Sequence, residues 1–346
     1  MIRIGIIGAT GAVGEALIRI LLGHPDAELA FLGSDHAAGQ RIDEVLPVLR
    51  GQLDAPCREP ELEALAAECD IVFMAKKGPE SMAWTPKLLD AGLKVIDHGG
   101  EFRFRDPAAY EAAYGNKHTC PELLAEAVFG LPELYRGQIK AARLVGNPGC
   151  YPTGAILPLA PLLAEGLIEP DGIIVDAYSG LSGAGRQYSA KARNLFLDCD
   201  ENARAYGLIT HRHAPEMEQE LAAAAGRAAT VVFIPHLIPV DRGILTTSFA
   251  RLTREATSAD VLTLWRERYD GEPFVHIVDD PGSVELAHVA RTNYCDFSAA
   301  VDPRTRTLVA VSALDNVIKG ACGMAVQNMN LMMGVEETAG LLHRCV

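Results

Sequence analysis

The first part of the chain alternates short apolar segments with segments of helical period. Four segments are almost entirely apolar at their centres: 2–8, 27–34, 69–75 and 93–100. Between the first two, "AVGEALIRILLGH" repeats its apolar residues every three or four positions, which predicts an amphipathic helix over 12–24. Strands apolar on both faces and separated by helices are typical of a parallel sheet covered on both sides. We therefore expect an α/β, Rossmann-type, doubly wound domain over 1–147.

The pattern changes after residue 150. A helical segment, 153–167, is followed by segments that alternate apolar and polar residues: 172–180, 229–252, 274–279, 289–301 and 307–316. Such strands with short polar connections indicate a mostly antiparallel sheet with helices on one face. We expect an α+β second domain over 148–315. The C-terminal segment, about 316–346, has helical spacing of Met, Val and Leu, and we expect it to complete the first domain.

Composition and charge exclude several function classes. The 346 residues exceed what one hydrophobic core normally fills, which agrees with two domains. The formal net charge is −14 and no block of Lys or Arg occurs, so nucleic acid and membranes are not expected partners. The N-terminus lacks a spanning segment and a signal-peptide pattern, so we expect a cytoplasmic protein. The eight cysteines form no CxxC pair, which argues against disulfides and structural zinc.

The segment "GATGAVG" lies between the first strand and the first helix. Glycines at 8, 11 and 14 allow a tight turn and the close approach of a pyrophosphate, and the helix N-terminus offers N–H donors. A dinucleotide here would contact Gly8, Thr10, Gly11, Ala12 and Val13. A tight turn without a ligand is the alternative. The spacing G-x-x-G-x-x-G does not decide which nucleotide binds.

The second strand ends in "LGSDHAAGQR", where this fold places the adenosine ribose. Ser34 suits the 2′-phosphate of NADP, because a hydroxyl can donate to it. Asp35 suits the free 2′-hydroxyl of NAD, because a carboxylate accepts from it. These two residues alone leave the choice of cofactor open.

A single cysteine lies in the constrained segment "GNPGCYPTG". Cys150 follows a predicted strand and precedes a predicted helix, and a helix N-terminus favours the thiolate form. The neighbouring glycines and prolines fix the turn and would expose the sulfur. Cys150 is therefore a candidate nucleophile. A buried structural thiol is the alternative, and it is the better interpretation for the other seven cysteines.

The segment "HRHAPEMEQEL" gathers candidate acid–base groups. Histidine suits proton transfer near pH 7, and His211, His213 and Glu216 lie at a predicted helix start, with Glu216 in the first turn. The two histidines could also form half of a metal site, but no third ligand has suitable spacing, so no metal is expected. A surface pair without a role is the remaining alternative.

Two glycine-containing segments carry arginines: "YSGLSGAGR" and "PVDRGILTT". Successive N–H groups in such loops, beside an arginine, can bind an anion. The candidate substrate-binding residues are Ser182, Gly183, Arg186 and Arg242. Hairpin turns with solvated arginines are an equally acceptable interpretation.

Together these motifs resemble the N-acetyl-gamma-glutamyl-phosphate reductases of the semialdehyde dehydrogenase superfamily. The resemblance covers almost the whole chain and includes "GNPGCYPTGAILPLAPL", "HRHAPEMEQEL", "PHLIPVDRGILTT" and "ALDNVIKGACGMAVQNMN". The cysteine motif combined with HRHxPE is specific to that family. Two segments depart from its usual pattern: "FMAKKGPES" at 73–81 and "DHGGEFR" at 97–103.

The resemblance implies NADPH-dependent reduction of an acyl phosphate in arginine biosynthesis. Cys150 would form a thioester with release of phosphate, and hydride transfer would then give N-acetylglutamate semialdehyde. His213 would be the acid–base group, with His211 and Glu216 orienting it.

The resemblance also assigns further residues and an assembly. Arg103 would bind substrate, Asn316 would contact NADP(H), and the second domain would form a homodimer or homotetramer. Three alternatives stay open: a sister reductase acting on an aspartyl, aminoadipyl or carrier-linked acyl phosphate, a non-catalytic dinucleotide-binding paralogue, and a cysteine hydrolase. The hydrolase would leave the glycine loop without a purpose.

Overall fold

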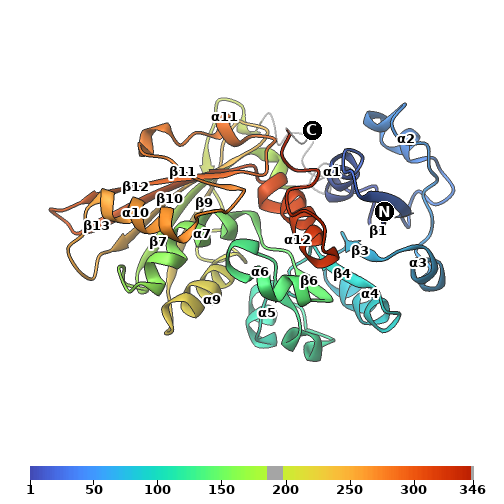
Figure 1. The fold of residues 1–346 in the computed structure, drawn as a ribbon, viewed down its shortest axis with the longest axis horizontal. Coiled ribbons are helices and arrows are strands. Elements are labelled where there is room, and N and C mark those ends of the chain that lie inside the picture. Colours follow the sequence, from blue (N-terminus) through green and yellow to red (C-terminus); the bar gives the residue numbers. More distant parts are fainter. Residues whose placement is uncertain (185–197, 344–346) are drawn as a thin grey trace. The chain divides into compact units, whose positions relative to one another are not determined.

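The structure is a computed structural model that describes residues 1–184 and 198–343 (Figure 1). It contains two compact units, Met1–Pro148 with Ala321–Val346, and Gly149–Gly320. The chain therefore enters the second unit immediately before Cys150. Among the described residues, no helix has the length and apolar character needed to cross a membrane.

A six-stranded parallel sheet forms the centre of the first unit. Its order is β2-β1-β3-β4-β6-β5, and every neighbouring pair is parallel. The strands are β1 (Ile2–Ile7), β2 (Ala27–Gly33), β3 (Ile71–Met74), β4 (Lys94–Asp97), β5 (Val128–Phe129) and β6 (Leu144–Gly146). The first four coincide with the four apolar segments. Strands β1, β3 and β4 lie inside the sheet and are buried on both faces, whereas β2 lies at its edge and is buried mainly in its second half. The predicted Rossmann-type sheet is confirmed.

Helices cover this sheet in two groups. The first group is α1 (Ala12–Leu21), α6 (Pro132–Ala141) and α12 (Gly323–Met333), in which α12 contacts the other two. The second is α3 (Leu62–Glu68) and α4 (Pro79–Asp90), which contact each other. The sheet grows from β1 to β2 in one direction and to β3 in the other, so right-handed connections place α1 and α3 on opposite faces. Shorter elements are α2 (Ile42–Val45), η1 (Pro47–Leu49), α5 (Pro107–Tyr114) and η2 (Pro121–Ala125).

A seven-stranded mixed sheet forms the second unit, in the order β11-β12-β13-β10-β7-β9-β8. The strands are β7 (Ile173–Ser179), β8 (Arg204–Ala205), β9 (Val231–Leu237), β10 (Ile244–Arg251), β11 (Val275–Ile277), β12 (Cys295–Asp302) and β13 (Thr307–Leu314). Only the β11–β12 and β7–β9 pairs are parallel, so the prediction of a mostly antiparallel sheet is confirmed.

The long helices that contact this sheet are α7 (Cys150–Ala164), α9 (Ala214–Ala225) and α10 (Ser258–Arg268). Short elements are η3 (Leu181–Ala184), η5 (Pro281–Ser283), α11 (Leu286–Val289) and the π-helical η6 (Ile318–Cys322). The prediction of one strand over 289–301 is wrong in its first part, since α11 ends there and β12 begins only at Cys295. Arg291 has a φ of 66°, which interrupts an extended chain.

Helix α7 is held firmly although it contains two internal prolines, Pro158 and Pro161. Each proline lacks the N–H that would bond the carbonyl four residues earlier. Two side chains supply the missing donors. Ser312 Oγ, in β13, donates to Gly154 O at 2.7 Å, and the hydroxyl of Tyr269, the residue after α10, donates to Leu157 O. The helix that begins with Cys150 is therefore fixed by side chains from two other elements.

The two segments that depart from the family pattern are bonded to each other in the first unit. The Gly78 N–H donates to Glu101 Oε1 at 2.7 Å, and Ser81 Oγ donates to Asp97 Oδ1 at 2.6 Å. A Cβ on Gly99 would lie 1.6 Å from Glu101 Oε2, so the glycine makes room for this carboxyl group. Since each departure accommodates the other, they form one structural unit.

Both of these carboxyl groups are buried, with Asp97 0% and Glu101 1% exposed. Burial, reinforced by the nearby charge of Glu101, raises the pKa of Asp97 well above its ordinary value. Asp97 therefore binds its proton more tightly in the folded protein than in the unfolded chain.

Replacing Asp97 by Asn is expected to flatten the pH dependence of stability. Between the unfolded pKa of about 3.8 and the raised folded pKa, the folded state holds more protons, so the free energy of unfolding falls as pH rises. Asp97→Asn removes this fall, which amounts to at most about 1.4 kcal/mol per pH unit. Urea unfolding from pH 4.5 to 8 measures it, with the exposed Asp90→Asn as control. A slope in Asp97→Asn equal to that of the wild type would contradict the expectation.

Candidate active site

Cys150 is the first residue of α7, directly after the N-cap residue Gly149. No side chain caps this helix, so the dipole of its N-terminus acts on the groups at its start. Among the cysteines in the described part of the chain, Cys150 alone is partly exposed, and the others are buried. Burial raises the pKa of the Cys69 and Cys120 thiols to about 12. Cys150 is thus the thiol placed for reaction.

Two glycines allow close packing around Cys150. A Cβ on Gly149 would lie 2.6 Å from His213 Nε2, and a Cβ on Gly320 would lie 2.7 Å from the Cβ of Cys150. The imidazole of His213 therefore rests against the residue that precedes the thiol, while η6 packs against Cys150 itself. Any side chain at either glycine would force these groups apart.

Glu216 connects the starts of α7 and α9. Its buried carboxylate accepts the Gly149 N–H at 2.7 Å through Oε1. It lies in the first turn of α9, as the sequence pattern predicts, and His213 is the N-cap residue of that helix. The structure thus brings Cys150, His213 and Glu216 together at two adjacent helix starts.

His211 has a different environment from His213. Its Nδ1 accepts the backbone N–H of His213 at 3.2 Å, and its ring lies edge-on to Tyr151 and Phe233, with centroids 5.6 and 5.1 Å away. Burial, with a smaller contribution from the charge of Arg212, lowers the pKa of His211 to about 4. His211 is therefore neutral near pH 7 and helps to fix the backbone at His213.

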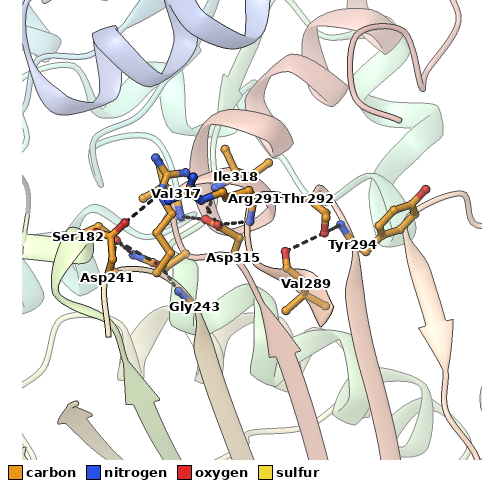
Figure 2. Close-up of polar contacts among 12 residues, drawn as sticks. Ser182, Asp241, Gly243, Val289, Arg291, Thr292, Tyr294, Asp315, Val317 and Ile318 are labelled. Atoms are coloured by element: carbon orange, nitrogen blue, oxygen red, sulfur yellow. Dashed lines mark hydrogen bonds and ion pairs between the residues drawn. The ribbon is translucent and has the colours of Figure 1, made fainter. Parts of the chain in front are cut away.

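The two predicted anion-binding loops are bonded to each other in the second unit (Figure 2). The N–H and the hydroxyl of Ser182 donate to Asp241 O at 3.0 and 2.6 Å. Asn316 joins both loops, because its Nδ2 donates to Ser182 Oγ at 3.0 Å and its Oδ1 accepts the Gly243 N–H at 2.7 Å. Gly183 adjoins this amide, with its Cβ position 3.4 Å from Asn316 Nδ2. The predicted cofactor contact of Asn316 stays a prediction.

Asp315 organises the turn after β13, and the sequence analysis missed it. Its fully buried carboxylate accepts the N–H groups of Val317, Ile318 and Arg291 at 2.8, 2.9 and 2.6 Å (Figure 2). Arg242 Nη1 lies 3.8 Å from Asp315 Oδ2. The Asp315 carbonyl also accepts the Gly320 N–H at 2.8 Å. This turn therefore positions both Arg242 and Gly320, the glycine that packs on Cys150. The sequence feature that could have identified Asp315 is an acidic residue directly after an apolar strand, in "ALDN".

The other predicted substrate-binding arginines lie elsewhere. Arg103 belongs to the first unit, where its buried guanidinium donates to Asn147 O at 2.6 Å and His98 O at 3.2 Å. Arg186 lies outside the described residues.

The glycine loop of the first unit has the features that a dinucleotide site needs. Gly8 has a φ of 96°, and a Cβ on Gly14 would lie 2.4 Å from Gly8 O, so α1 packs directly on the loop. Helix α1 begins at Ala12 without a side-chain cap, leaving the N–H groups of Ala12 and Val13 directed at a ligand position. Thr10 Oγ1 and Ser34 Oγ lie 2.9 Å apart beside it. These residues fit a pyrophosphate and the adjoining ribose.

Replacing His213 by Asn is expected to slow alkylation of Cys150 at pH 7, because the imidazole that lies against Gly149, next to the thiol in the chain, is expected to favour the thiolate and is lost. A decrease of about threefold or more is expected. His211→Asn is the matched control, since His211 bonds backbone and should change the rate little. Peptide mass spectrometry after iodoacetamide treatment measures the rate at Cys150. Equal rates in both variants would contradict the expectation that His213 favours the thiolate of Cys150.

Comparison with known proteins identifies the family of this chain. Residues 3–142 match the family described as semialdehyde dehydrogenase, NAD binding domain, and residues 150–316 match semialdehyde dehydrogenase, dimerisation domain. The aspartate semialdehyde dehydrogenase II of Vibrio cholerae has the same fold, with a TM-score of 0.72 and 18% identity over 96% of this chain and 98% of that one.

Closer relatives are N-acetyl-gamma-glutamyl-phosphate reductases. That of Symbiobacterium thermophilum is 49% identical, and that of Desulforapulum autotrophicum is 42% identical, each over 99% of this chain and 98% of the relative. The resemblance expected from the cysteine and HRHxPE motifs is thus confirmed. The chain belongs to the N-acetyl-gamma-glutamyl-phosphate reductase family of the semialdehyde dehydrogenases.

Proposed function

We propose that the protein reduces N-acetyl-gamma-glutamyl phosphate to N-acetylglutamate 5-semialdehyde and phosphate with NADPH, a step of arginine biosynthesis. The observation that carries this proposal is the meeting of Cys150, His213 and Glu216 at the start of α7, in a chain that also holds a dinucleotide loop. A nucleophilic thiol and a hydride donor are the two components that reduction through a thioester requires.

Cys150 performs the first chemical step. Its thiolate attacks the acyl carbon, the bond from that carbon to the phosphate oxygen breaks, and phosphate leaves with the electron pair. The product is a thioester on Cys150. The N-terminal turn of α7 supports the negative charge that develops on the carbonyl oxygen, because its N–H dipoles point toward that position.

His213 transfers the proton in this scheme. It accepts the thiol proton before the attack and returns a proton when the tetrahedral species after reduction breaks its carbon–sulfur bond to give the aldehyde. When bound, NADPH supplies the hydride that reduces the thioester carbon. His211 and Glu216 act as positioning residues, since one accepts the His213 N–H and the other accepts the Gly149 N–H.

Arginines near the site are needed to bind an anionic substrate, because the protein as a whole is acidic. The net charge of −14 disfavours approach of an acyl phosphate, so cationic groups near Cys150 are needed. Arg242 is the candidate in the second unit, held by Asp315 and supported by the Ser182–Gly183 loop. Arg103 and Arg186 stay predictions for substrate binding. Membership of this family disfavours the aspartyl, aminoadipyl and carrier-linked acyl phosphates as substrates. The intact arrangement around Cys150 disfavours a non-catalytic dinucleotide-binding protein.

The protein forms a homo-oligomer through its dimerisation domain. We infer a homodimer or homotetramer that uses the face of the seven-stranded sheet opposite α7, α9 and α10. Side chains there are partly exposed and apolar, including Ile174 (39%) and Val232 (50%). Such a face is typical of an interface. The cytoplasmic location stays a prediction.

Replacing Cys150 by Ser is expected to abolish turnover while leaving NADPH binding intact. A hydroxyl lacks the acidity and nucleophilicity of the thiol, so a decrease in kcat of about a thousandfold or more is expected. Absorbance at the NADPH band measures it in the reverse direction, with N-acetylglutamate semialdehyde, phosphate and NADP, and with aspartate semialdehyde as the comparison substrate. A variant that keeps a tenth of the wild-type rate would contradict the thioester mechanism, and preference for aspartate semialdehyde would contradict the substrate.

A further inference from the structure

An ion pair crosses the end of the strand that carries the glycine loop. The sheet order β2-β1-β3 places the carboxyl end of β1 between those of its two neighbours. Asp35 lies two residues after β2, and Lys76 lies two residues after β3. The Lys76 ammonium pairs with Asp35 Oδ2, and Glu80 Oε2 lies 3.3 Å from the same nitrogen. The pair therefore joins the segments on either side of the "GATGAVG" loop, at the carboxyl ends of the strands where the nucleotide is expected.

Arg41 and Arg58 follow β2, but carboxylates elsewhere bind their guanidinium groups. Arg41 pairs with Asp43 at 2.9 Å and with Asp54 at 3.1 Å. Arg58 pairs with Glu68 at 2.6 Å, and its guanidinium lies 4.2 Å from the centroid of the Phe31 ring.

Lys76 differs from them, because the carboxylate that it binds is the one at the ribose position. Thr10 and Ser34 place two hydroxyls beside that position. This end of the site thus combines the Lys76 ammonium and two hydroxyls with two carboxylates, those of Asp35 and Glu80.

We propose that Lys76 binds the 2′-phosphate of NADP(H), exchanging the Asp35 carboxylate for the phosphate. This inference rests on the proposed function, because it takes NADP(H) as the cofactor. A phosphate monoester carries more negative charge than a carboxylate and offers three acceptor oxygens, so it competes well for an ammonium. The Ser34 and Thr10 hydroxyls can donate to the same phosphate. An aspartate that alone would favour NAD is in this way compatible with NADP(H).

The exchange gives the two members of the pair opposite effects on binding. Without the Lys76 charge, Asp35 repels the 2′-phosphate and accepts a free 2′-hydroxyl, so selectivity moves toward NAD. Without the Asp35 charge, Lys76 keeps only the exposed Glu80 as a partner and the repulsion at the ribose position is gone, so selectivity for the 2′-phosphate increases. An ion pair that only stabilises the fold would change both in the same direction.

Calorimetric titration with 2′,5′-ADP and 5′-AMP tests the proposal, because the two ligands differ only in the 2′-phosphate and take no part in reduction. Lys76→Met is expected to weaken 2′,5′-ADP binding about tenfold and to change 5′-AMP binding less than twofold. Asp35→Asn is expected to tighten 2′,5′-ADP binding about threefold. Lys117→Met, an exposed lysine of the same unit, is the control for charge alone.

An unchanged affinity ratio in Lys76→Met, or a shift in the same direction in both variants, would overturn the proposal. Loss of both ligands from both variants would also overturn it, since the pair would then only hold the fold. The result is separable from the activity of the enzyme: failure of the Cys150→Ser test with the expected ratios would refute the proposed reaction and leave the phosphate contact standing.

Discussion

The hydrogen bond from the Gly149 N–H to the buried Glu216 carboxylate is the constraint on which the active site depends. Cys150 and His213 begin different helices and are distant in sequence, so local structure cannot bring them together. The bond joins the first turn of α9 to the N-cap residue of α7 at 2.7 Å. Leaving a buried polar group without such a partner costs about 1–3 kcal/mol, so the arrangement resists separation. The thiol and the imidazole are therefore placed by one buried carboxylate.

Close packing at two glycines also fixes the positions of His213 and Cys150. Gly149 lets the imidazole of His213 approach the backbone, and Gly320 lets η6 press against Cys150. Asp315 then fixes the turn that carries Gly320, through three backbone N–H groups and one carbonyl. The prolines of α7 add rigidity, because their missing hydrogen bonds are replaced by Ser312 and Tyr269. The start of α7, which carries Cys150, is thus fixed by contacts with α9 and η6, and the rest of the helix by contacts with β13 and Tyr269.

Sequence reasoning predicted the parts of this protein that depend on local pattern. Apolar segments identified β1 to β4, and turn residues placed Cys150 at a strand-to-helix junction. The short β5 and β8 have two residues each, too few for any periodicity. The positive φ at Arg291 could not be predicted from the local pattern; the backbone N–H of this residue donates to Asp315, which is distant in the sequence.

The same limit applies to the sites. Cys150, His213 and Glu216 carry chemistry by residue type and were found, whereas Asp315 and Gly320 act by position and were not. The segments 73–81 and 97–101 looked like two separate departures from the family. The structure shows them bonded through Gly78 and Glu101, and only a contact between distant residues could show this.

The central claim is that Cys150 carries the acyl group as a thioester. Mass spectrometry of the intact protein and of its peptides, after mixing with N-acetyl-gamma-glutamyl phosphate in the absence of NADPH, tests it most directly. The account predicts one N-acetylglutamyl group on the Cys150 peptide, release of an equal amount of phosphate, and loss of the adduct when NADPH is added. Phosphate release without an adduct, or an adduct on another residue, would contradict it.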